Sequence, residues 1–136
     1  MKLLMFYAHE FWFRTTHKVL ESAEDTDRDE RVQDAVVVFI HAEAEDEGHS
    51  SKVLAKLVKN VKWLAGKFHS NNVVLHSFSH LSGSRASPDF AQQILVDAQT
   101  RLQTSGFTTR MTPFGYLHEF SLHVSGKSLG RVFKEI

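Results

Sequence analysis

The 136-residue chain contains no cysteine. Disulfide-stabilised scaffolds, cysteine nucleophiles and zinc sites built on thiolates are therefore excluded. Long hydrophobic runs are also lacking, because no stretch approaches the roughly 20 apolar residues that a membrane helix needs. Residues 1–10 lack the apolar region and the small-residue cleavage site of a signal peptide. We therefore expect residues 1–136 to form a single soluble, cytoplasmic domain with no membrane partner.

The common motifs of nucleotide and ester chemistry are missing as well. No Gly-x-Ser-x-Gly elbow, Walker loop or dinucleotide fingerprint occurs. Residues 126–128 read Gly-Lys-Ser, like the end of a Walker loop, but Ser121 stands where that loop requires a glycine. The activity must therefore be sought outside these common classes.

Net charge is absent, but the two signs are separated along the chain. Residues 1–47 hold five basic and twelve acidic side chains, whereas residues 48–136 hold eleven basic and four acidic ones. One interpretation is a pair of solvated acidic loops on a neutral domain. The other is a basic face for a nucleic acid, with the acidic loops turned away from it. Composition alone does not choose between them.

Strands are predicted where apolar and β-branched residues run together. These stretches are residues 3–13, 35–42, 72–81 and 107–124, the last of them interrupted by Pro113 and Gly115. The acidic stretch of residues 21–34 is expected to form a loop or a frayed surface helix.

Helices are predicted at two places between these strands. Ser50 or Ser51 can cap a helix that continues to Phe68, with apolar residues at helical spacing and lysines on the opposite face. The run Ser87–Asp89 is a strong helix start, and Gly106 is well placed as the end of that helix. The order of elements predicts an α/β fold in which a mixed β-sheet is packed with two main helices.

Histidine is the unusual residue of this sequence. His76 and His80 lie four positions apart, which places them on one face of a strand. With an aspartate or glutamate they would make a metal site, and the alternative is a pair of hydrogen-bonded polar residues near a sheet edge. His80 is the stronger candidate for a functional role, because functional groups in open α/β sheets gather at the carboxyl ends of strands.

The run Pro113–Tyr116 is the second unusual feature. Proline fixes φ and glycine permits an otherwise forbidden φ, so Pro113 and Gly115 together shape the backbone sharply. Such a kink lets backbone groups approach a ligand closely. A plain bulge or bend is the alternative.

Two motifs together carry a family resemblance. They are Phe78-x-His80-Leu81-Ser82 and Pro113-Phe114-Gly115-Tyr116, separated by a predicted helix. With this spacing, essentially the whole chain resembles the archaeal-type editing domain of threonyl-tRNA synthetase. The resemblance implies a fold similar to D-aminoacyl-tRNA deacylases and a single aminoacyl-tRNA editing domain over residues 1–136. It also implies hydrolysis of serine wrongly attached to tRNA(Thr), with no metal and no cofactor.

Editing of this kind has a physical reason. A missing methyl group costs a synthetic site only about 1–3 kcal/mol, which is too little for reliable selection of threonine over serine. A second site that admits serine and excludes threonine corrects the error. It needs backbone groups for the amino acid and the terminal adenosine, a tight wall, and a water positioned by backbone groups, the terminal ribose hydroxyl and polar side chains.

The resemblance assigns roles to individual residues. His80 would contact the seryl-adenosine end, and Ala42 stands where the family has a small or branched apolar pocket residue. His80 and His118 are the predicted catalytic residues. The predicted substrate-binding residues are Ala42, Ser77, Phe78, Ser79, Phe114, Gly115, Tyr116, Leu117 and Arg131.

Three of these positions depart from the family. Leu117 and His118 replace a tyrosine and a lysine, and Arg131 replaces a glutamate. His118 can position the attacking water through a ring nitrogen, which would make the rate sensitive to pH near neutrality. The alternative is a catalytically weakened module that binds an aminoacyl nucleotide or a tRNA end. A metal-dependent hydrolase built on His76 and His80 is the third hypothesis.

The expected partner is the 3′ end of tRNA(Thr) carrying serine. Arg110, Lys127 and Arg131 are candidate phosphate contacts in the basic part of the chain. A homodimer is expected because related folds pair, and because the apolar strand Leu3–Phe13, if exposed, would accept a partner strand. A synthetase catalytic body is a further possible partner, although the end at Ile136, without linker-like residues, favours a free-standing protein.

Overall fold

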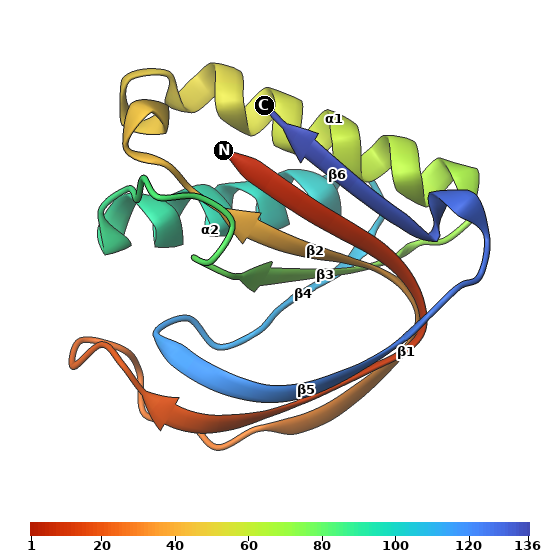
Figure 1. Cartoon of the computed structure of the whole chain (residues 1–136), viewed down its shortest axis with the longest axis horizontal. Helices are drawn as coiled ribbons and strands as arrows, with labels where there is room; N and C mark the ends of the chain where they lie inside the picture. The colour runs from red at the N-terminus through yellow and green to blue at the C-terminus, as the bar shows by residue number, and fades with distance from the viewer.

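The computed structural model describes residues 1–136 as a six-stranded sheet with both helices on one face (Figure 1). The strands are β1 (Lys2–Lys18), β2 (Asp29–His41), β3 (Asn72–Ser77), β4 (Thr108–Met111), β5 (Tyr116–Val124) and β6 (Arg131–Glu135). The helices are α1 (Ser50–Lys67) and α2 (Pro88–Thr104), and two short 3-10 turns are η1 (Ala44–Gly48) and η2 (Ser128–Gly130). The predicted α/β class, with a mixed sheet and two main helices, is confirmed.

The long strand β1 lies inside the sheet. The strand order is β4-β3-β2-β1-β5, and β6 also pairs with β1. Strands β2, β3 and β4 run parallel to one another, whereas β1 is antiparallel to β2, β5 and β6. Residues 2–6 of β1 pair with β6, and residues 8–18 pair with β5 along the same edge. The expectation that Leu3–Phe13 is an exposed strand is therefore wrong, because both of its edges are already paired.

The main core fills the space between the sheet and the two helices. Leu3 and Met5 of β1 and Val36 and Val38 of β2 face this layer, where the apolar sides of α1 and α2 cover them. Nineteen buried residues make up this cluster. A buried apolar core of this size can stabilise the domain without disulfides.

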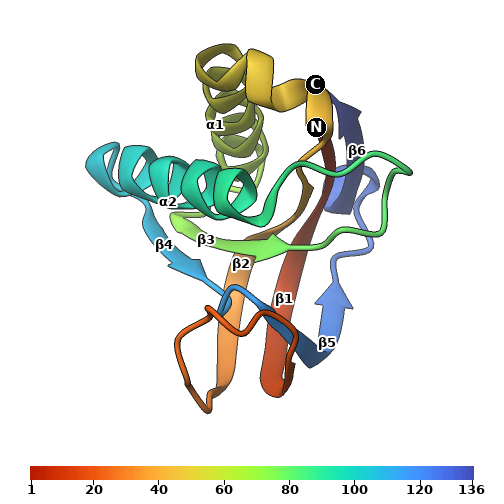
Figure 2. The same ribbon diagram turned by 90° about the vertical axis from the view of Figure 1, so that its left-hand side faces the viewer.

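A second apolar cluster occupies the opposite face of the sheet. It contains Ala8, Phe11, Phe13, Val32, Ala35, Val37, Phe39 and Val74. No helix covers this face. Instead, β1 and β2 bend strongly, and their far halves curve with β5 beneath β3 (Figures 1 and 2). The curl encloses the aromatic side chains of this cluster, and Phe11 and Phe39 pack against the ring of His76.

A bulge accounts for this bend. Along β1 the residues that face the curl change from even to odd numbers, from Ala8 to Phe11 and Phe13. The pairing of β1 with β5 shifts at the same point, between Ala8 and Glu10. Beside it, Asp34 of β2 has a φ of +51°. An extra residue in a strand reverses the alternation and bends the sheet, which is what both strands show at one level.

Several predicted boundaries change in the structure. Residues 29–34 belong to β2 rather than to a loop, because they pair with the second half of β1 and bury Val32. Strand β3 ends at Ser77, so residues 78–81 are not strand. The first helix begins at Ser50, with His49 at the N-cap position and no side-chain cap. For α2 the predicted cap is confirmed, since the Ser87 hydroxyl accepts a hydrogen bond from the N–H of Phe90.

Neither helix is long and apolar enough to cross a membrane.

Candidate functional site

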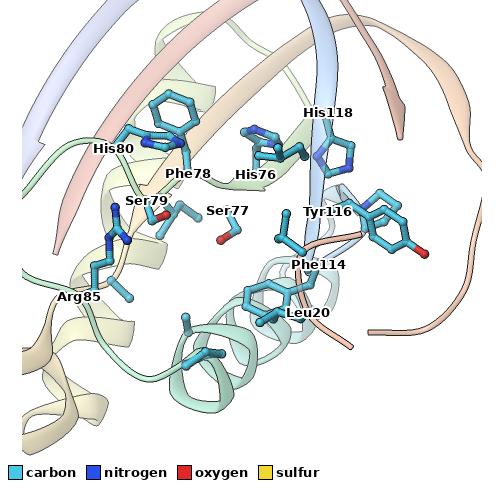
Figure 3. Close-up of a pocket in the computed structure, with 18 of the residues that line it drawn as sticks. Leu20, His76, Ser77, Phe78, Ser79, His80, Arg85, Phe114, Tyr116 and His118 are labelled. Atoms are coloured by element: carbon cyan, nitrogen blue, oxygen red, sulfur yellow. The ribbon is translucent and has the colours of Figure 1, made fainter. Parts of the chain in front are cut away.

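A cavity of about 460 Å³ opens where β3 ends, between the start of α2 and the curled part of the sheet. Its walls come from β3 and the loop after it, from β5 and the turn before it, and from the segment that follows β1. Ten of the eleven predicted site residues line it, namely Ala42, Ser77, Phe78, Ser79, His80, Phe114, Gly115, Tyr116, Leu117 and His118. The two sequence motifs therefore meet across one cavity (Figure 3).

Buried His41 fixes the loop that carries Ser79 and His80. Its Nδ1 accepts a hydrogen bond of 2.9 Å from the N–H of Leu81, and its Nε2 donates to the carbonyl oxygen of Ser84 at 2.6 Å. The side chain is only 1% exposed. Because both ring nitrogens are used on loop backbone, His41 positions the loop without touching the cavity itself.

A second anchor lies beside His41. The Ser82 hydroxyl donates to Oε2 of Glu43 at 2.6 Å, and the α-amino group of Met1 lies 2.8 Å from Oε1. Burial raises the pKa of Glu43, but the hydrogen bonds from the α-amino group and from Ser82 outweigh this and lower it to about 2. Ala86 adds a backbone hydrogen bond of 3.0 Å to the carbonyl oxygen of Ala42. These contacts bring Ala42 and the loop after β3 to the same wall.

The opposite wall depends on Gly115. Its φ is +86°, and a Cβ atom there would lie 2.7 Å from Cβ of Ala23 and 3.3 Å from Cβ of Leu20. Its carbonyl oxygen accepts hydrogen bonds from the N–H groups of Val19 at 2.7 Å and Leu20 at 3.3 Å. The glycine is therefore required both by its backbone conformation and by the close approach of the segment after β1.

Tyr116 ties down the acidic loop next to this wall. Its hydroxyl donates to the carbonyl oxygen of Glu24 at 2.9 Å and accepts from the N–H of Thr26 at 3.0 Å. Figure 3 shows the hydroxyl pointing away from the cavity. Tyr116 thus contributes the side of its ring to the cavity, and its polar end holds the loop.

Two imidazole rings lie next to each other at the inner end of the cavity, those of His76 and His118, with centroids 5.4 Å apart (Figure 3). Nδ1 of His76 lies 2.8 Å from Oγ1 of Thr112. Burial, with a smaller contribution from His118, lowers the pKa of His76 to about 3. Burial also lowers the pKa of His118 below 6.5, and the guanidinium of Arg28 lowers it further. Both rings are therefore neutral at pH 7.

His118 has an unusual polar atom. Its Nε2 is sealed from solvent and has no hydrogen-bond partner. A buried polar atom without a partner is costly, so in native proteins it points to strain, catalysis or a bound ligand. At the wall of a cavity, a ligand that rearranges the ring or its surroundings would relieve this cost.

The mouth of the cavity carries the exposed groups. His80 is exposed, and its ring lies edge-on to that of Phe78, with centroids 5.0 Å apart. Arg85 is the one arginine or lysine side chain that lines the cavity. In Figure 3, Ser77 and Ser79 lie between Arg85 and Phe114. The mouth therefore offers an aromatic surface and one permanent positive charge, that of Arg85.

Arg131 is the predicted site residue that the structure does not bring to the cavity. It begins β6, opposite Phe6, and its guanidinium lies 3.4 Å from the carbonyl oxygen of Ser125. The other two predicted phosphate contacts, Arg110 on β4 and Lys127, also lie outside the cavity lining. The ammonium group of Lys127 sits 5.9 Å from the ring centre of Phe68.

The histidine pair proposed as metal ligands is separated by the end of β3. His76 is buried in the strand, whereas His80 follows in the loop and is exposed. No group of three histidine, aspartate or glutamate side chains in the chain is arranged to hold a metal ion. The donor set for the metal-dependent hypothesis is therefore incomplete.

Sequence reasoning missed part of the cavity lining. Val19 and Leu20 precede the acidic run and carry no motif, and Arg85 is a single basic residue in an expected loop. Phe120 follows the second motif on the same face of β5 as His118, so strand alternation was the available signal for it.

Comparison with known proteins gives the family. The model of the archaea-specific editing domain of threonyl-tRNA synthetase matches residues 1–136. The chain is 32% identical over 139 residues to a threonine–tRNA ligase of Methanosphaera stadtmanae and 29% identical over 139 residues to that of Thermococcus onnurineus. Both alignments cover all of this chain and 22% of the relative, so the chain spans about a fifth of these ligases.

A solved structure shares the fold. The c-Myc DNA unwinding element binding protein superposes with a TM-score of 0.72 at 10% identity, covering 100% of this chain and 99% of the other. This likeness concerns the fold, which is D-aminoacyl-tRNA deacylase-like as predicted. With the family model spanning every residue, the chain belongs to the archaeal editing domains of threonyl-tRNA synthetase.

Proposed function

We propose that this chain hydrolyses the ester bond of serine mischarged onto tRNA(Thr). The observation that carries the proposal is the cavity in which both family motifs meet, in a chain that the editing-domain model matches from end to end. The cavity combines an apolar wall with two neutral imidazoles and two serines. This is a suitable environment for a small polar amino acid linked to a ribose.

Size selection would rest on the apolar wall. Ala42, Pro88 and Ala91 line the cavity near the loop after β3. Side chains without hydrogen-bonding groups discriminate by contact, so the extra methyl group of threonine would be excluded sterically. His80, whose ring packs edge-on against that of Phe78, would contact the seryl-adenosine end at the mouth.

The proposed hydrolysis uses groups of the chain and of the substrate. A water held by Nδ1 of His118, whose Nε2 is sealed, and by the terminal ribose hydroxyl attacks the carbonyl carbon of the ester, and this nitrogen takes the proton of that water. The bond to the ribose oxygen then breaks, and the proton returns to that oxygen. A neutral ring is required for this step, and the lowered pKa of His118 provides it.

The tRNA itself would bind through the lysines of α1. This helix contains no aspartate or glutamate, and Lys52, Lys56, Lys59 and Lys67 lie along one exposed face of it. The ion pairs that lysines make in this chain involve Lys2 and Lys18 instead. A row of ammonium groups without ion-pair partners can bind the phosphates of a tRNA. The synthetase body would supply that tRNA in its charged form.

We also propose a homodimer, formed through the sheet face that the helices leave open. Phe133 of β6 pairs with Leu4 on this side, and it is 50% exposed and outside the cavity lining. Burying this ring against a second copy would remove apolar surface from water. The measurement is the mass in solution by light scattering, with Phe133→Glu as the variant expected to be monomeric.

A binding module without turnover is the second candidate. It is favoured by the sealed Nε2 of His118 and by Leu117, which is 49% exposed where the family has a tyrosine. Such a module would bind a stable seryl-adenosine analogue and leave the ester intact.

The deciding experiment measures deacylation of seryl-tRNA and threonyl-tRNA, both on tRNA(Thr), with EDTA present. Rapid loss of serine with threonine spared is the expected result. Ala42→Trp, which fills the cavity, should abolish the reaction. Tight binding of the analogue with no loss of serine would favour the binding module, and a reaction abolished by EDTA would contradict the metal-free mechanism.

A further inference from the structure

We propose that His76 is a catalytic residue of this cavity, whose Nε2–H binds the carbonyl oxygen of the aminoacyl ester and the negative charge that develops on it. The inference rests on the proposed hydrolysis and adds to it the group that stabilises the transition state. It comes from the hydrogen bonds of His76, from its place in the cavity and from the rings around it.

The proton of the ring is assigned by its partner. Thr112 is 3% exposed, and its hydroxyl group has one hydrogen-bond partner, Nδ1 of His76 at 2.8 Å. If Nδ1 carried the proton, the hydroxyl hydrogen of Thr112 would be buried without an acceptor. If the hydroxyl donates to Nδ1, both groups are satisfied and the ring proton resides on Nε2. The second arrangement therefore places a donor on Nε2.

The Nε2 atom is left free for a ligand. His76 lines the cavity, and none of the hydrogen bonds within the protein uses its Nε2. Nε2 of the neighbouring His118 is sealed, but Nε2 of His76 is not among the sealed atoms without a partner. His76 thus has one nitrogen fixed by the fold and one nitrogen that reaches the cavity.

Aromatic rings surround this donor. The ring centroids of Phe39, Phe120 and Phe78 lie 4.7, 5.8 and 6.1 Å from that of His76. Apolar surroundings strengthen a hydrogen bond to a developing charge, because little water competes for it. The same surroundings disfavour the charged imidazolium, so the ring stays a neutral donor at every pH at which the enzyme would be assayed.

The two rings divide the reaction between them. The water that attacks the carbonyl carbon gives a proton to His118, and the carbonyl oxygen becomes an oxyanion held by Nε2–H of His76. When the carbonyl bond reforms, the ribose oxygen leaves and takes the proton from His118. His76 keeps its own proton throughout. The two ring centroids are 5.4 Å apart, a separation at which both rings can contact one ester group.

The experiment compares two substitutions that differ in reach. In His76→Asn the amide oxygen replaces Nδ1 and keeps the Thr112 contact, but nothing donates at the position of Nε2. In His76→Gln the longer side chain places an amide N–H near that position. We expect kcat on seryl-tRNA(Thr) to fall about 100- to 1,000-fold in His76→Asn, with KM changed less than about threefold. His76→Gln should be at least about tenfold faster than His76→Asn.

Nitrogen-15 NMR of the wild-type imidazoles gives a readout that does not depend on activity or on a folded variant. The expected spectrum at pH 7 has a protonated Nε2 and a bare Nδ1 for His76. A proton on Nδ1 would overturn the proposal. Thr112→Ser keeps the hydroxyl and should keep this tautomer, whereas Thr112→Val should lose it.

The remaining outcomes separate the two proposals. A folded His76→Asn protein that keeps more than about a third of the wild-type kcat overturns the role of His76 alone. A His76→Gln protein no faster than His76→Asn does the same. If the wild-type protein hydrolyses neither seryl-tRNA nor threonyl-tRNA, the proposed function fails and the role of His76 falls with it.

Discussion

Replacing His76 by asparagine should remove much of the protein's sensitivity to mild acid. The ring of His76 is 4% exposed, and burial, together with His118, lowers its pKa from 6.5 to about 3. The unfolded chain takes up a proton at this residue below pH 6.5, and the folded chain does not. The free energy of unfolding is therefore unaffected by the titration of His76 above pH 6.5, and it decreases progressively as the pH falls from 6.5 toward 3.

The size of the effect follows from the shift. Each pH unit below 6.5 removes about 1.4 kcal/mol from the free energy of unfolding, until the folded ring itself titrates. His76 alone should therefore cost the wild-type protein about 1.4 kcal/mol at pH 5.5 and about 2.7 kcal/mol at pH 4.5. Asparagine does not titrate in this range, and its amide oxygen retains the contact with Thr112.

Urea unfolding of both proteins at pH 7.5, 6.5, 5.5 and 4.5, followed by the fluorescence of Trp12 and Trp63, measures this difference. The two curves of unfolding free energy against pH should converge or cross as the pH falls. Parallel curves would refute the reasoning, because they would mean that His76 is protonated equally easily in the folded and unfolded states.

Four further outcomes are expected. Gly115→Ala should lower the free energy of unfolding by about 1–3 kcal/mol, because the backbone there is left-handed and its Cβ would meet Ala23; Gly126→Ala, with nothing within 4 Å, is the control, and equal losses would contradict this account. Glu43→Gln should lower the free energy of unfolding by about 3 kcal/mol at pH 7, as measured with urea. The reason is that folding lowers the pKa of this carboxyl from 4.5 to about 2, so the carboxylate stabilises the folded state above pH 4.5, and this stabilisation is lost between pH 4.5 and 2. The rate of serine removal should not change with pH around pH 7 and should decrease only below pH 6.5, because the pKa of His118 is lowered from that value. If the rate of a His118→Gln variant decreased in the same way below pH 6.5, His118 would be excluded as the cause. Lys59→Glu should raise KM for whole seryl-tRNA and flatten its salt dependence, but leave the affinity for a seryl-adenosine analogue unchanged; equal effects on both ligands would contradict a role in phosphate binding.

The sequence determined the elements whose signals are local. The cap at Ser87, the proline after it and the apolar stripe of the following helix lie within a few residues of one another, and α2 forms where they predict. The two motifs of the cavity were visible for the same reason, because each of them occupies only a few consecutive residues.

Long-range contacts explain what could not be predicted. Residues 29–34 look like part of an acidic loop, and they become strand because β1 offers them a paired edge. Nothing near His41 indicates its role, since its partners Leu81 and Ser84 come about 40 residues later. Val19 and Leu20 are held at the cavity wall by backbone hydrogen bonds to Gly115, almost 100 residues later in the chain.

The bulge near residue 9 of β1 has a consequence for how this domain can change. On one side of it, Leu3 and Met5 belong to the helix-covered core, and on the other side Phe11 and Phe13 belong to the curled part of the sheet. Deleting the extra residue would remove the bulge and restore the regular alternation, so Phe11 and Phe13 would stay on the face of Ala8. The bend would be lost instead, and with it the curl of the sheet beside the cavity, while the helix-covered core kept its own side chains. The shape of the cavity can thus be altered by a change at one point of the strand, while the other half of the strand preserves the fold.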